Sequence, residues 1–181
     1  MRQFPYYPAT FIMRQVDSGT HRSIDIWHFK STKSNRTYIV EIEHFGRHLI
    51  AVKFFPKAFR NSKFRYFLMT NDYEPRTIVY SCLYVVKHYI DTDPLLSFGF
   101  VAASDIDEKK QQAPVNRRFS VYRKIMNLFF GTQTFLHIQD ASRRVYLLVS
   151  KKSLADNVIT IELLEAKLNR LYTEEFNLSW D

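Results

Sequence analysis

The fold is decided by residues 64–152, which run FRYFLMTNDYEPRTIVYSCLYVVKHYIDTDPLLSFGFVAA over residues 64–103 and NRRFSVYRKIMNLFFGTQTFLHIQDASRRVYLLVSKK over residues 116–152. The apolar residues change between helical and extended spacing along this stretch. Because connections between elements are short and handed, the order of elements narrows the choice of fold. The predicted order is a strand (64–70), a helix (75–90), a strand (95–103), a helix (116–130) and a hairpin (135–139 with 144–150).

The two helices have the clearest signals. The first places Ile78, Cys82, Val85, Val86 and Tyr89 at helical spacing, and it follows a polar start that contains a proline. The second carries Phe119, Tyr122, Met126 and Phe129 on one stripe. The polar and charged segment 105–114 between the strand and this helix predicts a mobile loop, of the kind that can serve as a lid.

The N-terminal part predicts an antiparallel meander. Residues 23–29 and 37–44 alternate apolar and polar side chains, as half-buried strands do. Gly46 supplies a turn before a return strand over 48–55, and residues 10–15 form a short first strand. The expected whole is one α+β domain over 1–181: a basic meander (1–70), a helix-strand-helix-hairpin unit (71–152) and a C-terminal amphipathic helix and tail (153–181). That last helix rests on the spacing of Ile161, Leu164, Leu168 and Leu171.

Composition restricts the function. The chain has four glycines, too few for a glycine-rich phosphate loop, and a single cysteine, Cys82, which favours a reducing compartment. The start has no apolar run typical of a signal peptide, and no window is apolar enough to cross a bilayer. We therefore expect a cytoplasmic protein that does not enter the membrane.

The net charge of +8 is concentrated in the first part of the chain. Residues 1–70 hold twelve Lys and Arg against four Asp and Glu, whereas residues 71–181 are neutral overall. Such an asymmetry indicates an anionic partner, with nucleic acid first among them. The alternative is that the basic side chains only solvate an aromatic sheet.

A basic and aromatic run is the first candidate site. Cations that neutralise phosphates beside rings that stack on bases are typical of single-stranded nucleic acid binding. The alternative is that the run forms two strands in which aromatic and basic side chains alternate, so that the rings lie in the core and the charges lie in water. The cations of this run are Lys53, Lys57, Arg60, Lys63 and Arg65.

A second basic cluster lies on the helix predicted over 116–130. It comprises Arg117, Arg118, Arg123 and Lys124, and the first two fall where the helix dipole disfavours cations unless an anion binds there. The alternative is a solvated helix face.

Other polar residues give weaker signals. His44 and His48 flank the glycine turn with no evident third ligand, so we expect no metal site. The acids Asp25, Glu41 and Glu43 of the meander are predicted to converge on one face, where they either pair with arginines or act as a base.

The order of meander, helix, strand, helix and hairpin resembles the core of the GNAT superfamily of N-acetyltransferases over residues 23–152. Asn116 and Tyr122 stand near the positions of an Asn and a thiolate-protonating Tyr in that family. The resemblance implies acetyl-CoA as cofactor. One departure is serious: residues 70–76, TNDYEPR, lack the small residues that bind the coenzyme pyrophosphate and contain two acids. The strand SFGF (97–100) and the helix start RFSVYRKI (118–125) also resemble a class of small bacterial proteins.

Three functions follow as hypotheses. The first is a bacterial binding protein without a cofactor that engages nucleic acid, in a setting such as toxin–antitoxin systems or phage defence. The second, implied by the resemblance, is a divergent acyl-CoA-dependent N-acetyltransferase with Tyr122 as acid, Glu41 or Glu43 as base, and Arg76, Arg117 and Asn116 on the coenzyme. The third is an interaction module that binds a protein partner or a second copy through its C-terminal helix.

Overall fold

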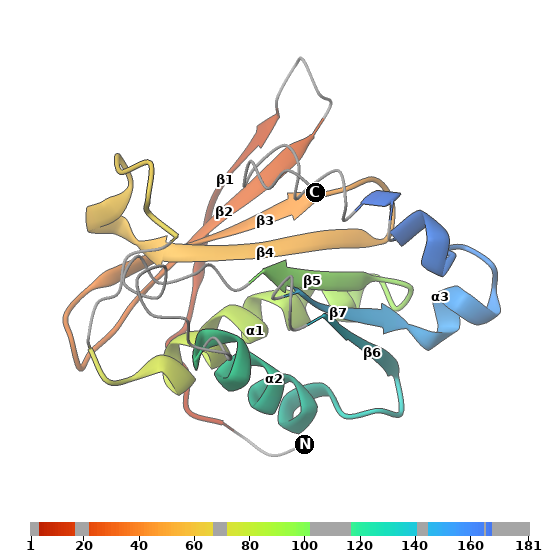
Figure 1. Ribbon diagram of the computed structural model, residues 1–181. Coiled ribbons are helices and arrows are strands. Elements are labelled where there is room, and N and C mark those ends of the chain that lie inside the picture. The colour runs from red at the N-terminus through yellow and green to blue at the C-terminus, as the bar shows by residue number, and fades with distance from the viewer. Residues whose placement is uncertain are drawn as a thin grey trace, which may run out of the picture.

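The computed structural model describes residues 4–16, 22–66, 72–101, 117–140, 145–164, 166 and 167. The protein has an α+β fold built on one mixed seven-stranded sheet (Figure 1). The strand order is β1-β2-β3-β4-β5-β7-β6. The strands are β1 Thr10–Val16, β2 Ser23–Lys30, β3 Thr37–His44, β4 Leu49–Pro56, β5 Ser97–Val101, β6 Phe135–Asp140 and β7 Val145–Ser150.

Strands β1 to β4 form the predicted antiparallel meander. The turn between β3 and β4 also forms as predicted, with Gly46 at a φ of +85° and Phe45 N–H donating to the Leu49 carbonyl at 2.9 Å. A glycine suits this turn because its lack of a Cβ permits the left-handed conformation. The meander is thus defined by alternation and by one glycine.

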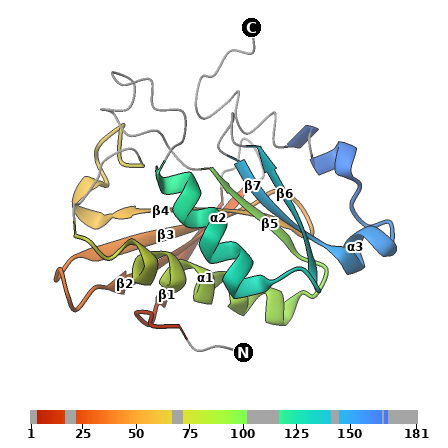
Figure 2. The same ribbon diagram turned by 60° about the horizontal axis from the view of Figure 1, so that its bottom comes forward.

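Strand β5 joins the meander to the hairpin. It pairs parallel with β4 over only three residue pairs, from Leu49–Ser97 to Ala51–Gly99, and antiparallel with β7. Figure 2 shows β4 and β5 separating toward their C-terminal ends. Every described side chain of β5 is buried, as the apolar run over 97–103 predicted for a central strand.

Two helices cover one face of the sheet, which we call the helix face. They are α1, Pro75–Thr92, and α2, Arg117–Phe130, both as predicted to within two residues. Figures 1 and 2 show them side by side on this face. The main core lies between the helices and the sheet, and it includes Val40, Leu83, Phe98 and Leu148.

Two short segments cover the opposite face of the sheet beside β7. They are helix α3, Lys151–Ala155, and a helical turn at residues 161–164. Ile159 and Leu164 pack there with Leu49 and Val149 in a second core. The turn at 161–164 belongs to the predicted C-terminal helix, of which residues 168 and 171 lie outside the described residues. Helix α3 was not predicted.

The predicted strand over 64–70 is wrong for its described part. After the 3-10 helix η1, Lys57–Phe59, residues 63–66 form turns. The Tyr66 ring packs edge-on against Phe55 at 5.4 Å, and the Tyr66 hydroxyl donates to Glu41 at 2.5 Å. Tertiary contacts to β3 and β4 therefore override the alternating pattern of this segment. Residues 67–70 lie outside the described residues, as do the predicted loop over 105–114 and Asn116.

None of the described helices combines the length and the apolar character that crossing a bilayer requires.

Candidate functional site

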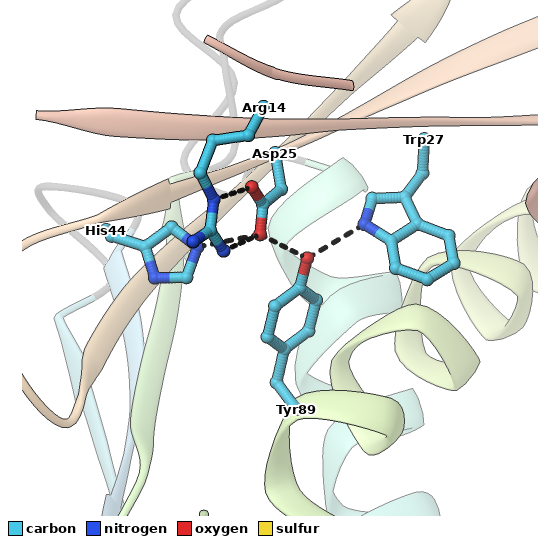
Figure 3. A network of polar contacts seen from close by, with 5 residues as sticks. All are labelled: Arg14, Asp25, Trp27, His44 and Tyr89. Atoms are coloured by element: carbon cyan, nitrogen blue, oxygen red, sulfur yellow. Dashed lines mark hydrogen bonds and ion pairs between the residues drawn. The ribbon is translucent and has the colours of Figure 1, made fainter. Parts of the chain in front are cut away.

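A buried carboxylate, Asp25, is the centre of a polar network on the helix face (Figure 3). It is 1% exposed and accepts from Arg14 of β1 through two guanidinium nitrogens, at 2.5 and 2.7 Å. The Tyr89 hydroxyl of α1 donates to Asp25 Oδ2 at 2.7 Å, and His44 Nε2 of β3 lies 3.0 Å from the same oxygen. Trp27 Nε1 in turn donates to the Tyr89 hydroxyl at 2.8 Å. Four elements therefore meet at one carboxylate.

This environment keeps Asp25 ionised. Burial alone would raise the pKa of its carboxyl, but the hydrogen bonds from Arg14, Tyr89 and His44 outweigh burial and lower the pKa to about 2. Burial and the bond to Asp25 also raise the pKa of Tyr89. A carboxylate held so far below neutrality is a weak base, so the network suits fixing the positions of its elements better than proton transfer.

The three acids of the meander do not converge. Asp25 pairs in register with Ile42, so its side chain shares the helix face, whereas Glu41 and Glu43 alternate with Ile42 and lie on the opposite face. The predicted convergence is therefore wrong, because sheet register separates neighbouring residues of β3.

The residues assigned to acid and base in the transferase hypothesis lie on different sides of the sheet. Tyr122 of α2 contacts Phe54 of β4 and Phe100 of β5 on the helix face, with ring centroids 6.1 and 4.8 Å apart. On the opposite face, Glu41 accepts from Tyr66 and Glu43 is paired with cations. The described structure thus brings neither glutamate to Tyr122.

Lys53, predicted to bind nucleic acid, is occupied inside the protein. Its ammonium lies 2.6 Å from Glu43, which is 3% exposed by its side chain and also pairs with Arg22 at 3.4 Å. Arg65 lies over the rings of Phe55 and Tyr66 and donates to the Tyr66 hydroxyl at 3.0 Å. These two cations of the predicted run, Lys53 and Arg65, therefore contact other side chains of the protein on the opposite face of the sheet.

The other cations of that run are exposed. Lys57, Arg60 and Lys63 lie in and just after η1, at the end of β4. Phe64, 46% exposed, follows them, with the Lys63 ammonium 5.0 Å from its ring centre. The structure thus divides the predicted run into an exposed group and an engaged group.

Further cations lie at the same end of the sheet, which we call the cationic end. An antiparallel meander places the β2–β3 turn beside the end of β4, and Figure 1 shows the start of α1 there as well. Sequence reasoning missed the cations of the β2–β3 turn, although the meander prediction itself implied their position. The cationic end comprises the exposed side chains of Lys30, Lys33, Arg36, Lys57, Arg60, Lys63 and Arg76.

The acids near this end are already bonded. Asp72 accepts from Arg36 at 3.0 Å and from the Tyr38 hydroxyl at 2.9 Å. Glu74, 7% exposed at the start of α1, accepts from the Ser31 hydroxyl at 2.5 Å and from the Tyr7 hydroxyl at 2.7 Å. The start of α1 therefore holds a carboxylate of the protein itself, where the resemblance to N-acetyltransferases implies the pyrophosphate of the coenzyme.

The basic cluster of α2 lies on a different element from the cations of the cationic end. Arg123 and Lys124 are exposed on α2, which lies in front of the sheet in Figure 2. Arg117 and Arg118 begin the helix, but their side chains, like Asn116, lie outside the described residues. The seven cations of the cationic end therefore do not include this cluster.

The histidine pair does not form a site. His44 binds Asp25, and His48 Nδ1 lies 2.7 Å from Asp93. Within the described ranges, no group of three metal-ligating side chains comes together. Cys82 is buried in the main core, and burial raises the pKa of its thiol.

Comparison of the chain with protein-family models, with curated proteins and with solved structures finds no match.

Proposed function

We propose that this protein binds nucleic acid through the cationic end. One observation carries the proposal: seven exposed cations from three segments of the chain gather at one end of the sheet. The two carboxylates described there are bonded within the protein: Asp72 is paired with Arg36, one of the seven cations, and Glu74 accepts from the Ser31 and Tyr7 hydroxyls. Six exposed cations therefore remain beside the Arg36–Asp72 pair. A phosphate backbone carries the repeated negative charge that complements such a surface.

Salt dependence tests the proposal directly. The purified protein is titrated into fluorescently labelled single-stranded and duplex RNA and DNA over a salt series, and anisotropy reports binding. Each phosphate neutralised adds about 0.7 to the slope of log affinity against log salt for single strands and about 0.9 for duplex DNA. The variant Lys57→Gln/Arg60→Gln is therefore expected to lower affinity and to reduce the slope by about 1.4 for single strands.

A matched control separates this site from net charge. Lys151→Gln/Lys152→Gln removes the same charge from exposed positions on α3, at the other end of the sheet (Figure 1). We expect it to leave the slope nearly unchanged. Absence of binding at low salt, or an equal loss in the two variants, would overturn the proposal.

The second candidate is a divergent N-acetyltransferase. It is favoured by the element order and by the short parallel pairing of β4 and β5, with Tyr122 against rings of both strands. It is disfavoured by Glu74 at the start of α1 and by the separation of Tyr122 from Glu41 and Glu43. Thermal unfolding with and without coenzyme A tests it: a stabilisation that Tyr122→Phe preserves but Arg76→Gln weakens would support coenzyme binding, and no shift would remove the candidate.

The C-terminal interaction hypothesis loses part of its basis. Leu164, one of the predicted docking residues, is 1% exposed and packs into the second core with Phe45 and Leu49. The side chain that was expected to meet a partner therefore stabilises the chain itself.

A further inference from the structure

Tyr73 is an aromatic side chain held out in solvent by its neighbours in the chain. It is 87% exposed, the highest value among the large apolar side chains described. Its backbone has a φ of +53°, in the left-handed region that bulky residues rarely adopt. Of the other described non-glycine residues there, two are Asn, which tolerates the region, and His48 is bonded to Asp93. Tyr73 has neither explanation.

Both residues beside Tyr73 are anchored. Asp72 is bonded to Arg36 and Tyr38, and Glu74 is buried under the hydroxyls of Ser31 and Tyr7. The Tyr73 carbonyl accepts from the Lys33 ammonium at 3.3 Å. The backbone is thus fixed on both sides and at the residue itself, so the ring is projected from a rigid base. Strained residues that the surrounding structure fixes in this way cluster at functional sites.

The surroundings of Tyr73 are cationic. Lys33 contacts its carbonyl, Arg36 binds the residue before it, and Arg76 lies in the first turn of the helix that follows. The exposed ring of Phe64 lies in the turns of residues 63–66 that follow η1, at the same end of the sheet. A fixed ring among cations is the arrangement on which an unpaired base stacks while its phosphates are neutralised.

We propose that Tyr73 is a stacking platform for an unpaired base, which makes single-stranded nucleic acid the substrate class of the cationic end. This inference rests on the proposed function. Stacking requires an exposed base face, which a closed duplex offers only at its ends, so the ring favours single strands over duplexes. The cations alone would bind both.

The test compares Tyr73→Asn and Tyr73→Phe with the wild type. Asn accepts the left-handed backbone and removes the ring, whereas Phe keeps the ring. We expect Tyr73→Asn to weaken single-strand binding about tenfold and to leave binding to a long duplex, which has few end pairs per phosphate, nearly unchanged, with Tyr73→Phe close to wild type. Fluorescence of 2-aminopurine placed in the strand reports stacking directly, and its quenching on binding is expected to be lost in Tyr73→Asn. Thermal unfolding confirms that the variants fold.

The outcomes distinguish the two proposals. Equal effects of Tyr73→Asn on single strands and duplexes, or no effect on either, would overturn the stacking role while the salt slope still supported the cationic end. A wild-type protein that binds no nucleic acid would remove both proposals.

Discussion

Arg14 on the edge strand β1 and Asp25 on β2 are register partners that form a two-point ion pair through Nε and the terminal nitrogen of the guanidinium. The side chain of Arg14 is 54% exposed, whereas that of Asp25 is 2% exposed. A charged group of the surface thereby compensates a buried one. Tyr89 and His44 complete the shell of the carboxylate, so β1, β2, β3 and α1 are joined at this point.

Asp25 gives the stability of the protein a specific pH dependence. Its pKa is about 2 in the folded protein and about 3.9 in an unfolded chain, so the unfolded state binds more protons in acid. The stabilisation is complete above the unfolded pKa and is lost as pH falls from about 5 toward 2. The shift corresponds to about 2–3 kcal/mol of unfolding free energy. Urea unfolding over a pH series measures it.

The variant Asp25→Asn isolates this contribution. We expect it to be about 2–3 kcal/mol less stable than the wild type at neutral pH, with the difference shrinking toward pH 2. Asp156→Asn, at an exposed position, is the control for charge. A difference between wild type and Asp25→Asn that stays constant down to acid pH would contradict a depressed pKa at Asp25.

Tyr89→Phe is expected to weaken the network from the helix side. The change removes a donor to Asp25 and the acceptor of Trp27 Nε1, leaving an indole N–H unpaired. The expected loss is about 1–3 kcal/mol of unfolding free energy. The pKa of Asp25 is also expected to rise, since one of the bonds that lower it is gone. Chemical-shift titration of the Asp25 carboxyl carbon measures this, and an unchanged titration would argue against the bond.

Glu74→Ala is expected to destabilise the start of α1. The carboxylate satisfies the hydroxyls of Ser31 and Tyr7 and lies at the positive end of the helix dipole. Its removal is expected to cost about 2–3 kcal/mol, and Glu74→Gln, which keeps an acceptor, about half as much. Denaturant unfolding followed by circular dichroism compares the two. Equal stability of Glu74→Ala and wild type would show that the buried carboxylate contributes nothing.

Substitutions at Gly99 and Gly131 are expected to differ in their effect on stability. A Cβ at Gly99 in central strand β5 would lie 3.2 Å from the Tyr146 carbonyl oxygen and 3.3 Å from a Leu147 methyl carbon. Because a backbone carbonyl in a sheet cannot move freely, Gly99→Ala is expected to cost about 1–3 kcal/mol. Gly131, at a φ of +64°, meets nothing within 4 Å, so Gly131→Asn is expected to cost less than about 1 kcal/mol. Thermal unfolding of both variants would contradict this account if Gly131→Asn proved the more damaging.

The strands of the meander and the two long helices could be predicted because their signals are local. The alternation in β2 and β3 and the apolar stripe of α1 are patterns among residues that are only two to four positions apart in the sequence. The segment that failed, residues 64–66, alternates as a strand does, but Tyr66 bonds to Glu41, which is 25 residues earlier in the chain. A contact of that separation leaves no periodic signal in the sequence.

The candidate site was predicted only in part. Lys57, Arg60 and Lys63 form part of the cationic end, while Lys53 of the same run is paired with Glu43. Their spacing in sequence gives no sign of this difference. It arises because β4 places Lys53 opposite Glu41 and beside Glu43 on a covered face, whereas the later residues have left the sheet.

The sequence by itself determined the strands of the meander, the two long helices with their buried faces, and the basic character of the first seventy residues, because propensity and period act between near neighbours. Only the tertiary structure decided which charges remain available. Register put Asp25 and the glutamates of β3 on opposite faces, and strand order brought the β2–β3 turn, η1 and the start of α1 to one end. Burial and pairing of charges depend on such long-range contacts, since the free energy of a charged side chain is set by what surrounds it in space.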